Sequence, residues 1–285
     1  MIFASADIRD RIAERHLRVR GCVRISTDGS LTSLEERRMI ALRRHSPQDY
    51  AEFPNIDETN VGTLTVTDQA CLDEVGVCLL QAKAHERFGA ALLHSHFPIE
   101  SDETFLEEVH TDEERITLRP ARNGPSSLYA TSVCFDNDPR SGRFLLVGLE
   151  FASEQALAGV PPIDDLDRDV LTSVGRILQC REKIRRFGIR LLHDPLKLNG
   201  RVLLETCDPI NRVLTCRSAD EDDPDFVQST ATVFRWGEAR AQSEDGLVIS
   251  QKCMQFCKVA QRCVRPIHGS HQQSTSHEPT GHRSV

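Results

Sequence analysis

Two stretches of this chain of 285 residues read almost alike, Arg87-Phe-Gly-Ala-Ala-Leu-Leu-His94 and Arg186-Phe-Gly-Ile-Arg-Leu-Leu-His193. They end a longer match, in which residues 66–94 align with residues 165–193 at a constant offset of 99 without a gap. Eleven of these twenty-nine positions are identical, where ordinary composition would give about two by chance. A match of this length predicts an internal duplication.

The first part of each copy has the spacing of an amphipathic helix. Apolar residues stand at positions i, i+3 and i+7 in both copies (Leu72, Val75 and Leu79; Leu171, Val174 and Leu178). Phe-Gly is expected to end each helix, because glycine takes the left-handed conformation at low cost. Short apolar segments of β-forming residues follow. We therefore expect an α+β fold: an internal duplication of a helix followed by an antiparallel meander of three to four strands, arranged as a pseudo-two-fold pair.

The rest of the chain is divided by composition. Residues 1–65 form an N-terminal segment, with a strand expected over 17–25 and a helix over 31–44. Residues 66–152 hold the first copy and a connector strand, and residues 160–265 hold the second copy with a cysteine-bearing C-terminal helix. Residues 266–285 lack hydrophobic periodicity and are predicted to be a disordered tail.

Charge and hydropathy limit which partners and which compartment we expect for this chain. The chain has 35 basic and 43 acidic side chains, a formal net charge of -8, which disfavours a nucleic-acid partner. No apolar run approaches the length of about 18 residues that crosses a bilayer, and the first residues lack a signal-peptide pattern. We expect a cytoplasmic protein, with a nuclear one not excluded, that is neither secreted nor membrane-bound. In that compartment the ten cysteines are expected to be thiols.

His94-Ser95-His96 is the sharpest candidate for chemistry, because a His-x-His pair at a strand end can hold zinc. The spacing resembles that of the JAMM zinc isopeptidases. The resemblance implies His94, His96 and Glu107 as metal ligands and Glu74 as general base. The chain departs from that pattern in having Glu107 for aspartate and in placing Glu74 only twenty residues before His94.

A structural role is the alternative for the histidine that both copies share. The second copy retains His193 but has Pro195 where the first has His96. An imidazole kept in both copies is expected to hydrogen-bond to backbone at a strand end. Glu107, Glu108 and Glu205 each stand beside apolar residues in a strand pattern, which is typical of the solvent face of a sheet.

A second zinc candidate lies near the C-terminus. Cys253, Cys257 and Cys263 are followed by His268, and thiolates and imidazoles in a short span can form a tetrahedral zinc site. The spacing matches no standard zinc-finger pattern. Buried thiols that serve only packing are the alternative.

The stretch from Arg87 to Phe97, Arg-Phe-Gly-x-x-Leu-Leu-His-x-His-Phe, also resembles one in a set of uncharacterised, mostly fungal proteins. That resemblance implies no activity and no cofactor. The residues together favour a non-catalytic or accessory protein that binds a small molecule or a protein ligand in a cleft between the two copies. The alternative is a metal-dependent hydrolase that uses His94, His96 and Glu107.

Overall fold

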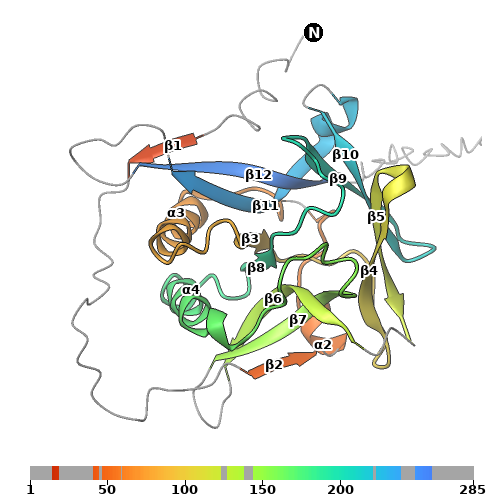
Figure 1. The fold of residues 1–285 in the computed structure, drawn as a ribbon, viewed down its shortest axis with the longest axis horizontal. Helices are drawn as coiled ribbons and strands as arrows, with labels where there is room; N and C mark the ends of the chain where they lie inside the picture. The colour runs from red at the N-terminus through yellow and green to blue at the C-terminus, as the bar shows by residue number, and fades with distance from the viewer. Residues whose placement is uncertain are drawn as a thin grey trace, which may run out of the picture.

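Ten strands close into one barrel in the computed structural model, which describes residues 15–18, 41–44, 47–58, 60–122, 127–137, 144–220, 223–238 and 248–258 (Figure 1). The first half of the barrel chain comprises α3 (Val66–Gln81), β3 (Phe88–Leu92), β4 (Thr104–His110), β5 (Arg115–Ala121), β6 (Tyr129–Asn137) and β7 (Phe144–Ala152). The second half comprises α4 (Arg168–Cys180), β8 (Phe187–Leu191), β9 (Val202–Asp208), β10 (Val213–Ala219), β11 (Ser229–Glu238) and β12 (Val248–Lys258). The short helix α2 (Pro47–Ala51) precedes both halves.

The strand order around the barrel is β12-β11-β3-β8-β6-β7-β4-β5-β10-β9, and β9 pairs with β12 to close it. Two seams are parallel, β4 with β7 and β9 with β12. Two further strands add to the outside, β1 (Arg15–Arg18) along β12 and β2 (Ala41–Arg44) along β7. Closure gives each barrel strand a partner on both sides, which removes the exposed edges of an open sheet.

The expected α+β pair of helix-plus-meander copies is wrong, because strands from both parts of the described chain close into a single barrel. Strands from the two matched segments pair with each other, β3 with β8 and β5 with β10. Those hydrogen bonds occupy the place where a cleft between two copies was expected. Consecutive strands do not form a meander either, since β4 pairs with β7 and not with β3. Local periodicity identifies strands but does not choose their partners.

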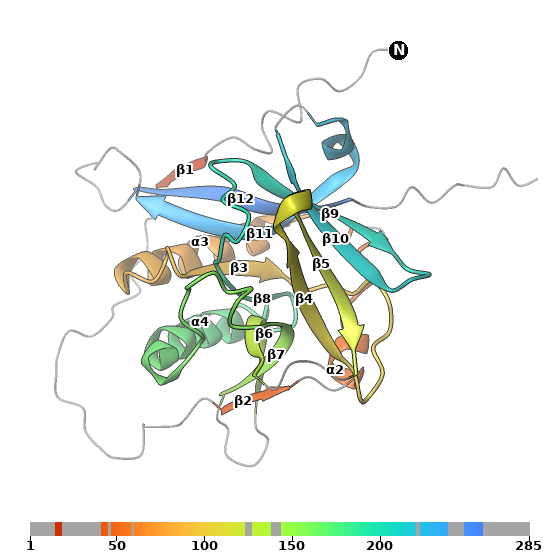
Figure 2. The same cartoon turned by 45° about the vertical axis from the view of Figure 1, so that its right-hand side comes forward.

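The helices α3 and α4 lie side by side against one side of the barrel (Figures 1 and 2). They form where the i, i+3, i+7 spacing predicts helices. Glycine permits the close packing: a Cβ at Gly76 would lie 2.4 Å from the Nε1 atom of Trp236, and one at Gly175 would lie 2.9 Å from a ring carbon of Phe135. The helix apolar faces, Phe88 and Phe187 are all part of the largest hydrophobic core.

The Phe-Gly pairs do not end the helices, as the sequence suggested, but lie inside β3 and β8. A Cβ at Gly89 would lie 2.5 Å from the carbonyl oxygen of Phe234 on β11, and one at Gly188 would lie 2.4 Å from the carbonyl oxygen of Val133 on β6. Glycine is therefore required where neighbouring strands approach closely. Arg87 of the motif binds Asp167 at the start of α4 through two hydrogen bonds of 2.8 and 2.7 Å.

Two terminal expectations also need correction. Residues 41–44, within the expected helix 31–44, form the strand β2. The first two residues of the expected strand 17–25 lie in β1 (Arg15–Arg18). The cysteine-bearing helix is the strand β12, because its residues complete the barrel by pairing with β11 and β9. The remaining residues of these N-terminal predictions and the predicted tail 266–285 lie outside the described residues. Among the helices of the described part, none is long and apolar enough to cross a membrane.

Candidate metal centre

Four side chains with metal-binding atoms meet inside the barrel. His94 and His96 follow β3, Glu205 lies on β9 and Cys257 lies on β12. Glu205 and Cys257 are directly opposite each other in the parallel β9–β12 pair, which points both side chains to the same face. One ligand atom from each of the four residues lies within 4.8 Å of every other.

The shortest distances join the two imidazoles and the carboxylate. The Nε2 atoms of His94 and His96 are 3.0 Å apart. Oε1 of Glu205 lies 2.9 Å from Nε2 of His96 and 3.7 Å from Nε2 of His94. The side chains of His94, His96 and Glu205 are only 11%, 2% and 4% exposed, so the cluster is withdrawn from bulk water.

A backbone hydrogen bond orients His94. Its Nδ1 lies 2.8 Å from the carbonyl oxygen of Leu92, which can only accept, so Nδ1 carries the proton. In the neutral ring Nε2 then presents its lone pair to the cluster. Histidines that bind metals in proteins are commonly held in this way.

The two oxygens of Glu205 have different neighbours. Oε2 accepts a hydrogen bond of 2.9 Å from Nε2 of Gln255 and a longer contact of 3.7 Å from the thiol of Cys216. Oε1 is buried and faces the two imidazoles, with Nε2 of His96 as its nearest partner at 2.9 Å. A cation bound at this point would take the place of the proton that these groups share.

The close approach of these groups shifts the pKa values of Glu205, His94 and Cys257. Burial of Glu205 works to raise its pKa, but His96 and His94 outweigh that effect and hold the pKa of Glu205 well below its ordinary value. Burial of His94 works to lower its pKa, but Glu205 outweighs it and the pKa of His94 is raised. Burial and the charge of Glu205 raise the pKa of the Cys257 thiol well above its ordinary value. A metal ion must therefore displace a proton from Cys257 to bind a thiolate there.

A second histidine–glutamate cluster lies beside the first and serves as a comparison. Nε2 of His193 is 2.5 Å from Oε1 of Glu107, and Nδ1 of His193 contacts the carbonyl oxygen of Leu191 at 3.2 Å. Arg190 binds Oε2 of Glu107 at 3.0 Å and also pairs with Glu150. The guanidinium of Arg190 thus supplies the positive charge that Glu107 needs. Glu205 has no arginine or lysine partner among the described residues.

The two clusters share a small cavity of about 40 Å³, lined by His94, His96, Glu205, Glu150 and Arg190 among others. The buried carboxylates of Glu107, Glu150 and Glu205 are paired with Arg190 and with the imidazoles of His193, His94 and His96. A cation bound among His94, His96 and Glu205 would take the place of a proton in this network.

The structure brings together only part of the predicted sites. His94 and His96 converge as the His-x-His spacing indicates, but Glu107 binds His193 and Arg190 instead. Glu74 lies on α3 and pairs with Arg181.

Of the C-terminal candidates, Cys257 joins the cluster and Cys253 does not, whereas Cys263 and His268 lie outside the described residues. Glu205 was missed, because its position beside apolar residues suggested a solvent face. It is buried, as is Glu107, and each directly follows a leucine, Leu204 and Leu106.

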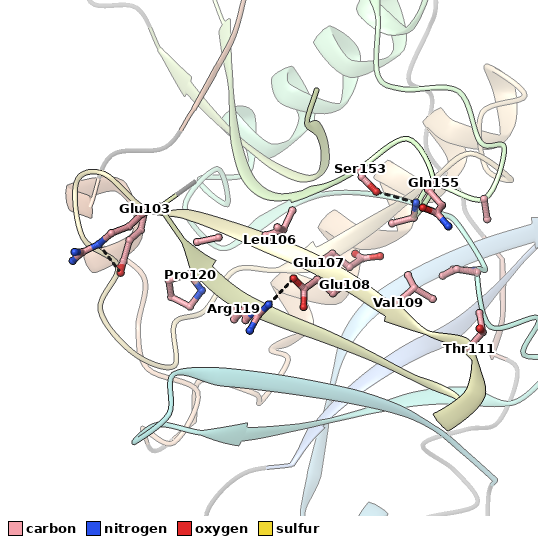
Figure 3. Close-up of a pocket in the computed structure, with 15 residues that line it drawn as sticks. Glu103, Leu106, Glu107, Glu108, Val109, Thr111, Arg119, Pro120, Ser153 and Gln155 are labelled. Carbon is pink, nitrogen blue, oxygen red and sulfur yellow. Dashed lines mark hydrogen bonds and ion pairs between the residues drawn. The ribbon is translucent and has the colours of Figure 1, made fainter. Parts of the chain in front are cut away.

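A larger pocket of about 950 Å³ lies outside this cluster, along β4, β5 and residues 153–158. Figure 3 shows Glu108 and Arg119 joined across the two strands, with Ser153 and Gln155 on the other side of the pocket. Comparisons with protein-family models, curated proteins and solved structures found no match to this chain.

Proposed function

We propose that this protein is a non-catalytic metal-binding protein that holds one divalent transition-metal ion, zinc in the first place, between His94, His96, Glu205 and Cys257. The observation that carries the proposal is the meeting of four metal-binding atoms inside the barrel, two imidazole nitrogens, a carboxylate oxygen and a thiol sulfur, all within 4.8 Å of one another.

The donor set favours zinc. Two imidazoles, a carboxylate and a thiol combine nitrogen, oxygen and sulfur donors, a mixture that suits Zn²⁺ and excludes Mg²⁺ and Ca²⁺, which prefer oxygen alone. Two nitrogen ligands of a tetrahedral zinc ion lie about 3.3 Å apart, given bond lengths of about 2.0 Å. The separation of 3.0 Å between the Nε2 atoms of His94 and His96 needs only a small adjustment.

The position of the ligands suggests what the ion does. The β9–β12 pair that closes the barrel is short, with only Leu203, Leu204 and Glu205 of β9 in register with β12. Glu205 and Cys257 face each other across it, and His94 and His96 reach it from the end of β3. An ion bound to all four would fasten three distant parts of the chain, and its binding free energy would become folding free energy.

The same donors favour a structural over a catalytic role. Four protein ligands complete a tetrahedral site, whereas catalytic zinc sites keep one position for water or substrate. The adjoining cavity of about 40 Å³ is of a size for water rather than for an organic substrate. The hydrolase alternative would need Glu107 as a ligand, and Glu107 is engaged with His193 and Arg190.

Metal analysis of the full chain after purification without chelators tests the proposal. We expect one equivalent of zinc, and its loss in His96→Gln and Cys257→Ser. The matched controls are His193→Gln, which removes the histidine of the other cluster, and Cys78→Ser, a buried thiol on α3. Both controls should retain zinc.

Cobalt substitution reports the ligands directly. Cobalt in the wild-type site should give the visible bands of tetrahedral coordination and a near-ultraviolet thiolate band that Cys257→Ser abolishes and Cys78→Ser keeps. Less than one tenth of an equivalent of any transition metal, with no uptake by folded protein from a zinc buffer, would overturn the proposal. The His94–His96 pair would then be held by a shared proton.

A further inference from the structure

The pocket of about 950 Å³ lies where the neighbouring strands β4 and β7 diverge. The parallel strands β4 and β7 are in register only at Leu106 with Phe151 and at Glu107 with Ala152. Beyond that point β4 continues along β5, while the chain leaves β7 at Ser153 and turns away. The pocket occupies the space between these diverging segments (Figure 3). Its volume is within the range of small-molecule sites.

The carboxylates that line the pocket already have partners. Glu103 receives hydrogen bonds of 3.0 and 2.5 Å from Arg212. Glu107 is held by His193 and Arg190, and Glu108 accepts a hydrogen bond of 2.8 Å from Arg119. The side chains that hydrogen-bond to Glu103 and Glu107, namely Arg212, His193 and Arg190, lie outside the pocket lining.

The hydrogen-bond donors of the lining are largely unused. Arg119 gives one hydrogen bond, from Nη2 to Glu108, although a guanidinium carries five N–H donors. Arg122 makes only long ion contacts, 3.4 Å to Asp102 and 3.8 Å to Glu103, and no hydrogen bond within the described structure. These two arginine side chains are 54% and 63% exposed.

Apolar groups form the rest of the lining. Leu106 and Val109 on β4, Ala156 in the turn after β7 and Pro195 after β8 contribute side chains without charge. Gln155, which lies beside them, donates no side-chain hydrogen bond in the described structure. The pocket therefore combines an apolar wall with guanidinium and amide groups that have further hydrogen bonds to give.

We propose that this pocket binds a small organic anion: an apolar body, aromatic or aliphatic, that carries a carboxylate, sulfonate or phosphate group for Arg119 and Arg122. Charge-assisted hydrogen bonds from guanidinium are well matched to such groups. The site goes beyond the metal centre, because His94, His96, Glu205 and Cys257 do not line it.

Two fluorescent probes with nearly the same aromatic body test the proposal. Anilinonaphthalene sulfonate carries an anionic group, and phenylnaphthylamine lacks it. With the folded, metal-loaded full chain, we expect saturable binding of the sulfonate at one site and binding of the neutral probe at least about tenfold weaker, since charge-assisted hydrogen bonds contribute about 1.5–3 kcal/mol.

Variants then locate the site. The double variant Arg119→Gln plus Arg122→Gln should weaken binding of the sulfonate about tenfold or more. It should leave the thermal midpoint within about 2 °C, because both side chains are largely exposed. Arg115→Gln is the matched control, being an arginine on the same strand that does not line the pocket.

Three results would overturn the proposal: equal affinity for the two probes, no saturation, or equal loss of affinity in Arg115→Gln and in the double variant. The single variant Arg122→Gln gives the same comparison if the double variant is not folded. Zinc content is measured in every sample. Failure of the metal proposal therefore shows as absent zinc, whereas failure of the anion proposal shows as unselective probe binding by the same protein.

Discussion

Glu205 and Cys257 lie opposite each other in register on the parallel strands β9 and β12, at the seam that closes the barrel. Their neighbours across the interior are His94 and His96. This parallel pairing of three residues joins the last strand of the barrel to β9, and the proposed metal ligands are concentrated there.

Removing the metal should therefore lower stability. At zinc concentrations about 1,000 times the dissociation constant, binding to the native state contributes about 4 kcal/mol, which corresponds to a shift in Tm of about 10 °C in a protein of this size. Calorimetry of the protein before and after treatment with a chelator, and again after zinc is restored, measures this shift in Tm. Cys257→Ser should have the low Tm in both conditions, and an unchanged Tm in chelated wild-type protein would contradict the expectation.

Replacing Arg190 by alanine should be strongly destabilising. The substitution leaves Glu107 and Glu150 buried without the guanidinium that pairs with both, at a cost of about 3–5 kcal/mol. Denaturant unfolding measures the difference. Arg201→Ala removes an exposed ion pair with Glu114 and should cost less than about 1 kcal/mol. Equal effects of the two substitutions would show that the buried cluster is not coupled through Arg190.

Gly89→Ala should destabilise the barrel by about 2–3 kcal/mol, because the new Cβ would meet the backbone oxygen of Phe234 at 2.5 Å and backbone cannot move away as a side chain can. Gly237, on β11, offers the control, since a Cβ there would meet nothing within 4 Å. Chemical denaturation of both variants tests the difference. If Gly237→Ala were as costly as Gly89→Ala, the close approach of strands would not be the cause.

Asp68 should give a measurable acid sensitivity. Burial of Asp68 works to raise its pKa, but the hydrogen bond from Lys183 and those from Thr65 outweigh it, and the pKa is lowered below its ordinary value. A lowered folded-state pKa contributes stability that is present above the ordinary value of about 4 and is lost as the pH falls through the folded pKa.

The free energy of unfolding of wild-type protein should therefore fall more steeply between about pH 5 and pH 2 than that of Asp68→Asn. Asp112→Asn, at an exposed position, should keep the wild-type slope. Parallel pH profiles of wild type and Asp68→Asn would argue against this role.

The sequence predicts features formed within one segment better than contacts between segments that are distant in the chain. Leu72, Val75 and Leu79 mark α3, because a helix is formed within one segment. The spacing of His94 and His96 likewise brings the two rings together. Glu205 is more than a hundred residues away, and only strand pairing across the barrel places it beside them.

The C-terminal cysteines show the same limit. Their spacing of four residues suits one face of a helix, yet Cys253 and Cys257 lie on β12, where strand partners determine the conformation. Glu205 is buried beside His94 and His96, which follow a different strand. No single segment carries that information.

The last described strand, β12, has a consequence for the order of events during synthesis. It supplies one side of the closing seam and the Cys257 ligand, and it is the final barrel strand to leave the ribosome. Until it does, β9 and β11 are open edges, and open edges recruit other strands. A nascent chain that ends before residue 248 therefore has three of the four proposed ligands but no closed barrel, so we expect metal loading to follow translation of β12.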